Sequence, residues 1–160
     1  MLITTLQILG VILALLVFMY TRAFQTNEAM GRHYPGFGKR FNIYFNSHVS
    51  ETSDTNVLPE MKYPRFEVST DKLFELMETA VKNLGWIIDS KDEANKEIKA
   101  IVQSNLFKFK DDIKIRAEKD EQAPSRIYAY SSSRIGFGDM GANQRHIMDL
   151  TAEIHKLINS

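Results

Sequence analysis

The sequence contains no cysteine, which excludes disulfide bridges, thiolate metal sites and cysteine nucleophiles. It also lacks a net charge, because 20 lysines and arginines balance 20 aspartates and glutamates. A balanced chain has no overall electrostatic attraction to nucleic acid, so no nucleic-acid partner is expected. With 160 residues, of which 44% are hydrophobic, the chain can form one small globular domain with some additional sequence.

The longest uncharged run lies at the start of the chain. From Leu2 to Tyr20 no residue is charged, and the run approaches the roughly 20 apolar residues that cross a bilayer as a helix. We therefore predict a single-pass transmembrane anchor over residues 1–21. No basic residue precedes the run, whereas several follow it: Arg22, Arg32, Lys39 and Arg40. This asymmetry predicts that the following domain lies on the cytoplasmic face of the membrane.

Residues 22–63 are predicted to form a polar juxtamembrane tether, with turn-forming stretches such as SETSDTN at 50–56. The tether contains more aromatic residues than a solvated linker needs. One interpretation is that they lie on lipid headgroups beside the basic residues. The other is that they pack on the domain or on a partner protein, and the sequence does not choose between the two.

A globular domain is predicted over residues 64–160. Apolar residues recur at helical spacing over 71–84 and again over 142–158. A short strand is predicted before the first helix, and four more strands lie between the two helices, at 86–90, 97–103, 112–118 and 126–133. This order predicts an α+β fold in which an antiparallel sheet of four to five strands has two helices on one face.

The strand at 112–118 alternates cleanly between apolar and charged residues. If the neighbouring strand is in register, the face turned away from the helices carries Lys114, Arg116, Tyr128 and Tyr130. We select Lys114, Tyr128 and Tyr130 as a candidate interaction surface, because polar and aromatic side chains suit a protein partner. The alternative is a solvated sheet face with cross-strand charge pairs.

The stretch SSSRIGFGDMGANQRH, residues 131–146, contains glycines at the G-x-G-x-x-G spacing. In dinucleotide-binding folds a parallel strand follows the helix, with an acidic residue about 20 positions after the motif. The printed sequence offers no such strand before Ser160, so we expect a tight structural corner in which Asp139 caps the last helix. The alternative is a phosphate or carboxylate site formed by the helix start with Ser131, Ser133, Arg134 and Arg145.

Catalytic residues are not predicted. Asp111 and Asp112 are adjacent, so in a strand their side chains point to opposite faces and cannot act as a dyad. Asp112 is better suited to form an ion pair with Arg134. Asp139 is a second candidate partner for Arg134. The histidine spacing matches no metal site and the serines match no hydrolase elbow, so neither a metal nor a cofactor is predicted.

Two segments of the domain resemble a known family. LFKFKDDIKIR, residues 106–116, and SSSRIGFGDMGANQRHI, residues 131–147, are similar to the paired signatures of the domain of unknown function 1499 family. The matching positions are Phe109, Asp111, Asp112, Arg116, Ser131, Ser133, Arg134, Gly136, Asp139, Gly141, Asn143 and Ile147. The resemblance covers about residues 64–158 and implies no established activity. Members often have an amino-terminal membrane segment or signal.

These observations predict a membrane-anchored, non-catalytic binding or assembly module, such as an accessory subunit of a membrane protein complex. Its expected partners are the lipid bilayer and other subunits of that complex. The alternative is a binder of a small anionic molecule or lipid headgroup, through an arginine and serine pocket at the start of the last helix. The candidate binding or structural cluster comprises Asp111, Asp112, Arg116, Ser131, Ser133, Arg134, Asp139, Asn143 and Arg145. If acidic residues neutralise the arginines, assembly is the better interpretation.

Overall fold

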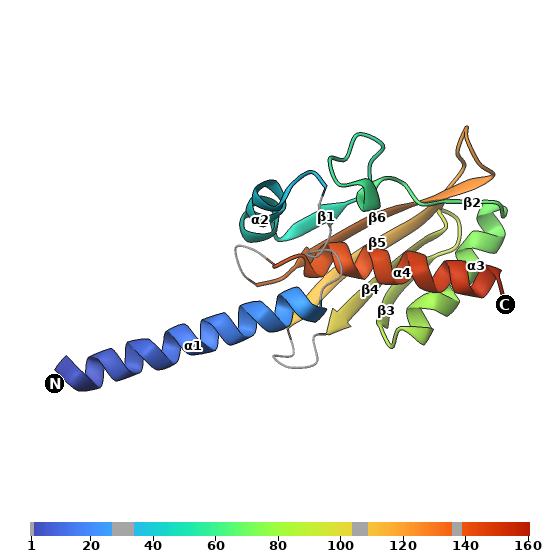
Figure 1. Cartoon of the computed structure of the whole chain (residues 1–160). Helices are drawn as coiled ribbons and strands as arrows, with labels where there is room; N and C mark the ends of the chain where they lie inside the picture. The colour runs from blue at the N-terminus through green and yellow to red at the C-terminus, as the bar shows by residue number, and fades with distance from the viewer. Residues whose placement is uncertain (1, 27–33, 104–108, 136–138) are drawn as a thin grey trace.

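The computed structural model describes residues 2–26, 34–103, 109–135 and 139–160 (Figure 1). Arg32, Gly136 and Gly138, which entered the predictions above, lie outside these residues. The helices are α1 (Leu2–Thr26), α2 (Phe37–Asn46), the 3-10 helix η1 (Pro59–Met61), α3 (Thr70–Asn83) and α4 (Ala142–Ile158). The strands are β1 (Val49–Glu51), β2 (Arg65–Phe66), β3 (Ile87–Asp92), β4 (Glu97–Gln103), β5 (Lys110–Glu118) and β6 (Ser125–Ser133).

The strands form one antiparallel sheet in the order β1-β6-β5-β4-β3, with β2 also paired to β6. The predicted α+β class and the meander from β3 to β6 are confirmed. The strand count is corrected, because the sheet has six strands rather than four to five. The strand that sequence reasoning missed is β1, which has only three residues and pairs with a strand about 80 positions later in the sequence.

Helices α3 and α4 cover one face of the sheet (Figure 1). Their side of β5 carries Ile113 and Ile115, which are buried, whereas Lys114 between them is on the opposite face. Helix α3 begins after Ser69, whose hydroxyl accepts a hydrogen bond from the Lys72 amide at 3.2 Å. The core therefore lies between these two helices and one side of the meander.

The hydrophobic core extends into the range assigned to the tether. Tyr44 of α2, Leu58 and Met61 of η1 are 1 to 3% exposed and belong to the core cluster. Arg40 is 2% exposed and binds Glu60 through two hydrogen bonds of 2.6 and 3.1 Å. Its guanidinium also donates to the Tyr44 hydroxyl at 2.6 Å, so this buried charge is fully surrounded by acceptors. Tyr34, by contrast, is exposed.

Helix α1 forms where the uncharged run predicts a helix, but the prediction that it spans a membrane is wrong. Over the residues that the structure describes, no helix has a stretch both long and apolar enough to cross a bilayer. A span needs about 20 predominantly apolar residues.

Candidate functional site

The corner between β6 and α4 is organised by the side chain of Asn143, which is fully buried. Its amide nitrogen lies 2.9 Å from the His48 carbonyl oxygen and 3.0 Å from the Ser133 hydroxyl. Its carbonyl oxygen accepts a hydrogen bond from the Ser131 hydroxyl. One side chain thus joins β6, α4 and the segment before β1, which is a structural function.

Asp139 caps the start of α4, as the sequence predicts. Its carboxylate accepts hydrogen bonds of 2.9 Å from the amides of Gly141 and Asn143, and it also contacts the Asn143 side chain. Burial raises the pKa of Asp139 above its ordinary value, although these hydrogen bonds oppose the shift. The first-turn amides that a bound anion would need are therefore already occupied by this carboxylate.

Asp111 has a partner that sequence reasoning missed. The Nε2 atom of His146 lies 2.9 Å from its Oδ2 atom, and both side chains are largely buried. The edge of the Trp86 ring lies against the imidazole, with ring centroids 5.9 Å apart. The spacing of 35 positions between Asp111 and His146 carries no local signal. Among the described residues, no hydrogen bond joins the imidazole to Ser131 or Ser133.

The arginines of the candidate cluster are not brought together. Arg134 donates hydrogen bonds of 2.8 and 2.6 Å to Asp112, which is one of its two predicted partners. This pair is about half exposed, and it lowers the pKa of Asp112. Arg145 pairs with Asp149 on the same helix at 3.3 Å. Arg116 lies on the same face of the sheet as Asp112 but pairs with Glu118 and Glu97 farther along the strands, so the three arginines do not line one pocket.

On the uncovered face, opposite charges face one another across the strands. Arg116 contacts Glu118 on its own strand and Glu97 on β4, the latter at 3.7 Å. Arg126 contacts the register partner Glu118 at 3.0 Å. These pairs are the cross-strand arrangement expected for a solvated sheet face. They neutralise the arginines at this end of the sheet.

Lys114, Tyr128 and Tyr130, the residues of the candidate interaction surface, lie together on the uncovered face. Lys114 and Tyr130 are register partners. The Lys114 ammonium lies 5.4 Å from the ring centroid of Tyr128 and 5.9 Å from that of Tyr130. The Tyr128 hydroxyl donates a hydrogen bond to Glu51 at 2.7 Å. Desolvation, and to a smaller extent this hydrogen bond, raises the pKa of Tyr128 to about 12.

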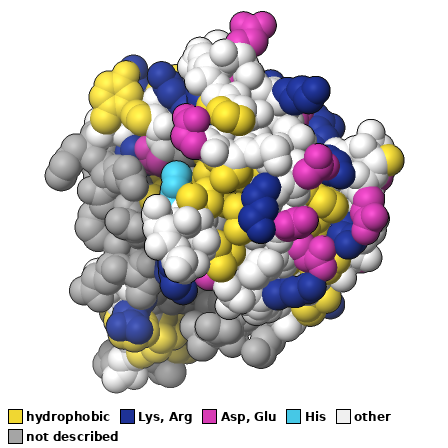
Figure 2. All heavy atoms as spheres, turned by 90° about the vertical axis from the view of Figure 1, so that its right-hand side faces the viewer, with side chains coloured by type: hydrophobic (Ala, Val, Ile, Leu, Met, Phe, Trp, Pro, Cys, Tyr) yellow, Lys and Arg dark blue, Asp and Glu magenta, His cyan; other side chains and the backbone are white. Residues whose placement is uncertain are grey.

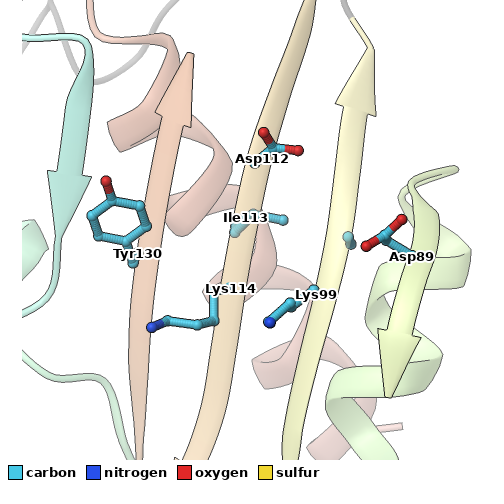
Figure 3. A pocket seen from close by; sticks show the side chains of 7 residues that line it. Asp89, Lys99, Asp112, Ile113, Lys114 and Tyr130 are labelled. Carbon is cyan, nitrogen blue, oxygen red and sulfur yellow. The ribbon is translucent and has the colours of Figure 1, made fainter. Parts of the chain in front are cut away.

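A hollow of about 300 Å³ lies beside these tyrosines on the uncovered face (Figure 3). It is lined by Asp89, Lys99, Ala100, Asp112, Ile113, Lys114 and Tyr130, which come from β3, β4, β5 and β6. Elsewhere, Figure 2 shows basic and acidic side chains interspersed on the side of the molecule that it presents. Over the described ranges no three histidine or acidic side chains converge as metal ligands.

Comparison with known proteins identifies the family. A profile described as "Protein of unknown function (DUF1499)" matches residues 42–154, which is more than half of the chain. The chain belongs to the DUF1499 family. No curated protein matches the sequence.

The DUF1499 match begins within α2 and ends within α4. It therefore includes β1 and η1, which precede the segment that the two signatures cover. Of the signature residues, Asp139 and Asn143 hold the corner together, and Asp112 and Arg134 pair on its outside. The conformation of Gly141, with φ of +80°, is one that glycine adopts without strain. In this chain the DUF1499 signatures thus describe a structural junction.

Proposed function

We propose that the chain is a non-catalytic module that binds a partner protein through the uncovered face of its sheet and so contributes to a protein assembly. The observation that supports this function is the set of aromatic and basic side chains on that face, Tyr128, Tyr130, Lys114 and Arg116. Tyrosine and arginine are enriched at protein interfaces. The helices α3 and α4 lie on the other face and leave this one uncovered.

The contacts at the signature corner support assembly over anion binding. Arg116, Arg134 and Arg145 each contact a carboxylate, and the three lie on different elements. The amides at the start of α4 are engaged by Asp139. An incoming anion would have to displace these carboxylates, which costs more than binding to unengaged donors.

A photoreactive phenylalanine analogue in place of Tyr130 tests the proposal in cells, because it keeps an aromatic ring on the uncovered face. A matched control carries the same analogue in place of Lys72, which is exposed on α3. We expect position 130 to give cross-links to a defined protein, repeated across preparations, that position 72 does not give. The proposal is wrong if position 130 gives no such adduct, or if both positions give the same ones.

A further inference from the structure

The uncovered face places two lysines directly opposite one another. Lys99 on β4 and Lys114 on β5 are register partners, and both side chains lie on this face (Figure 3). Residues in this relation have Cβ atoms only about 5 Å apart, and like charges there destabilise a sheet. An oppositely charged residue at either position would remove the repulsion, as it does at neighbouring pairs on the same strands.

Two other charged register pairs of this face are compensated. Glu97 and Arg116 are opposite in the register, as are Glu118 and Arg126. A second like-charged register pair, Asp92 and Glu97, lies at the β3–β4 hairpin, but each carboxylate has a partner there. Asn95 donates to Asp92 at 2.7 Å, and Arg116 lies 3.7 Å from Glu97.

Within the described ranges, the lysine pair has no carboxylate partner in close contact, although Lys99 interacts electrostatically with Asp92 at longer range. In the part of the chain that the structure describes, no carboxylate oxygen lies within 4 Å of Lys99 or Lys114. Both lysines line the hollow of about 300 Å³ with Asp89 and Asp112. Asp112 is already bound by Arg134. Asp89 also interacts electrostatically with Arg134, so neither carboxylate of the hollow forms an ion pair with the two ammonium groups.

The rings of Tyr128 and Tyr130 hold the Lys114 ammonium beside the hollow without neutralising its charge. A negative group entering the hollow would replace the repulsion between the lysines by two attractions. The group would also lie next to the Tyr130 ring. Aromatic side chains supply contact area around charged groups in protein interfaces.

We infer that this hollow receives a carboxylate side chain from an acidic segment of the partner protein. The inference rests on the proposed function and names the chemistry of the partner. Charge complementarity selects an acidic segment, and the position of Tyr130 in the wall of the hollow places that segment on the same surface. The repulsion between the two lysines is a cost to the free protein that binding removes.

Calorimetric titration of the full-length chain with a short peptide of alternating glutamate and glycine tests the inference. The exchange Lys99→Glu with Lys114→Glu reverses the charge of the hollow but keeps a like-charged pair in the register, so the sheet repulsion is unchanged. We expect it to weaken peptide binding at least about tenfold, with the wild-type affinity falling as salt rises. The matched control, Lys72→Glu with Lys156→Glu, makes the same charge change at exposed lysines of α3 and α4. It should leave the affinity within about twofold.

Other results would overturn the inference. One is that the peptide does not bind the wild type, and another is that both double variants lose the same peptide affinity. A third is that inorganic phosphate binds as tightly as the peptide, which would identify a small-anion site. Phosphatidylserine vesicles that bind the wild type and compete with the peptide would identify a lipid surface instead. Cross-links from position 130 that persist undiminished in the Lys99→Glu, Lys114→Glu chain would reject the charged hollow but leave the sheet-face function standing. If the analogue at position 130 gives no specific cross-links in the otherwise wild-type chain, both the charged hollow and the sheet-face function are rejected.

Discussion

The helix-covered face of the sheet takes Ile113 and Ile115 from β5, whereas the uncovered face takes Lys114 from between them. The same alternation runs along β6, where Ile127 and Ala129 are buried and Tyr128 is on the outside. One face binds the helices and supplies the stability of the domain. The other supplies little stability, so its residues are available for a partner.

The two faces also differ in how they satisfy polar groups. On the covered side, the buried Ser131 hydroxyl and Asn143 amide are hydrogen-bonded to neighbours within the corner. On the uncovered side, Lys99 and Lys114 lack a carboxylate partner among the described residues.

The largest effect is expected from shortening a buried side chain of the covered face. Ile115→Ala should lower the free energy of unfolding by about 3 kcal/mol, because it removes buried methyl groups and leaves a cavity. Lys114→Ala, one position earlier on the uncovered face, is the matched control and should change stability by less than about 0.5 kcal/mol. Urea denaturation followed by circular dichroism measures both. Equal losses in the two variants would contradict the division between the faces.

A smaller loss is expected at the signature corner. Asn143→Ala should cost about 2 kcal/mol, because it leaves the Ser131 hydroxyl buried without its partner and removes one of the two donors to the His48 carbonyl oxygen. Asn83→Ala removes a single exposed contact to Glu153 and serves as the control, with an expected change below about 0.5 kcal/mol. If urea denaturation gives the same midpoint for both variants, Asn143 does not hold the corner together.

The pair of Asp112 and Arg134 should contribute little, because both side chains are about half exposed. Arg134→Ala should lower the thermal midpoint at pH 7 by less than about 2 °C. Arg134 depresses the pKa of Asp112 in the folded state, so the contribution is present above the unfolded pKa of about 3.9 and is lost as the pH falls through the folded value. The wild type and the variant should therefore melt together in strong acid. If the difference between the two melting temperatures instead grows as the pH falls, the ion pair does not depress the pKa of Asp112.

The smallest effect should be a gain in stability. Lys99→Glu places a carboxylate opposite Lys114 and turns a repulsive register pair into an attractive one. We expect a rise in the melting temperature of about 1 to 2 °C at low salt, fading at high salt. Lys99→Gln is the control and should give about half of the gain. A fall in the melting temperature of Lys99→Glu at low salt would mean that the two lysines do not repel each other.

Sequence reasoning was most successful where the periodic signal is local. The bounds of β4, residues 97–103, and of α4, residues 142–158, agree with the predicted ones because alternation and helical spacing are read from neighbouring positions. Alternation also placed Lys114 and Tyr130 on one face. Strand β1 was missed because three residues carry no usable period, and its pairing with β6 depends on the whole fold.

The candidate site was harder to predict, because residue type does not say which neighbour a side chain will meet. Arg145 pairs with Asp149 on its own helix, and Arg116 pairs with Glu97 on the neighbouring strand. Both arginines nevertheless lie within the signature segments. The contact of His146 with Asp111 joins a helix to a strand and has no sequence spacing of its own. Register and rotation about each element decide these contacts.

The contacts of Arg40 have a consequence for how the protein can be divided. Arg40 on α2 grips Glu60 on η1, and between them β1 pairs with the end of β6. A fragment that begins after residue 63 would keep the meander, α3 and α4 but leave the Tyr130–Ser132 end of β6 without its partner β1. An unpaired strand edge is a template for association with other chains. The residues before 64 thus cover this part of the sheet edge, and their removal should make self-association of the fragment easier.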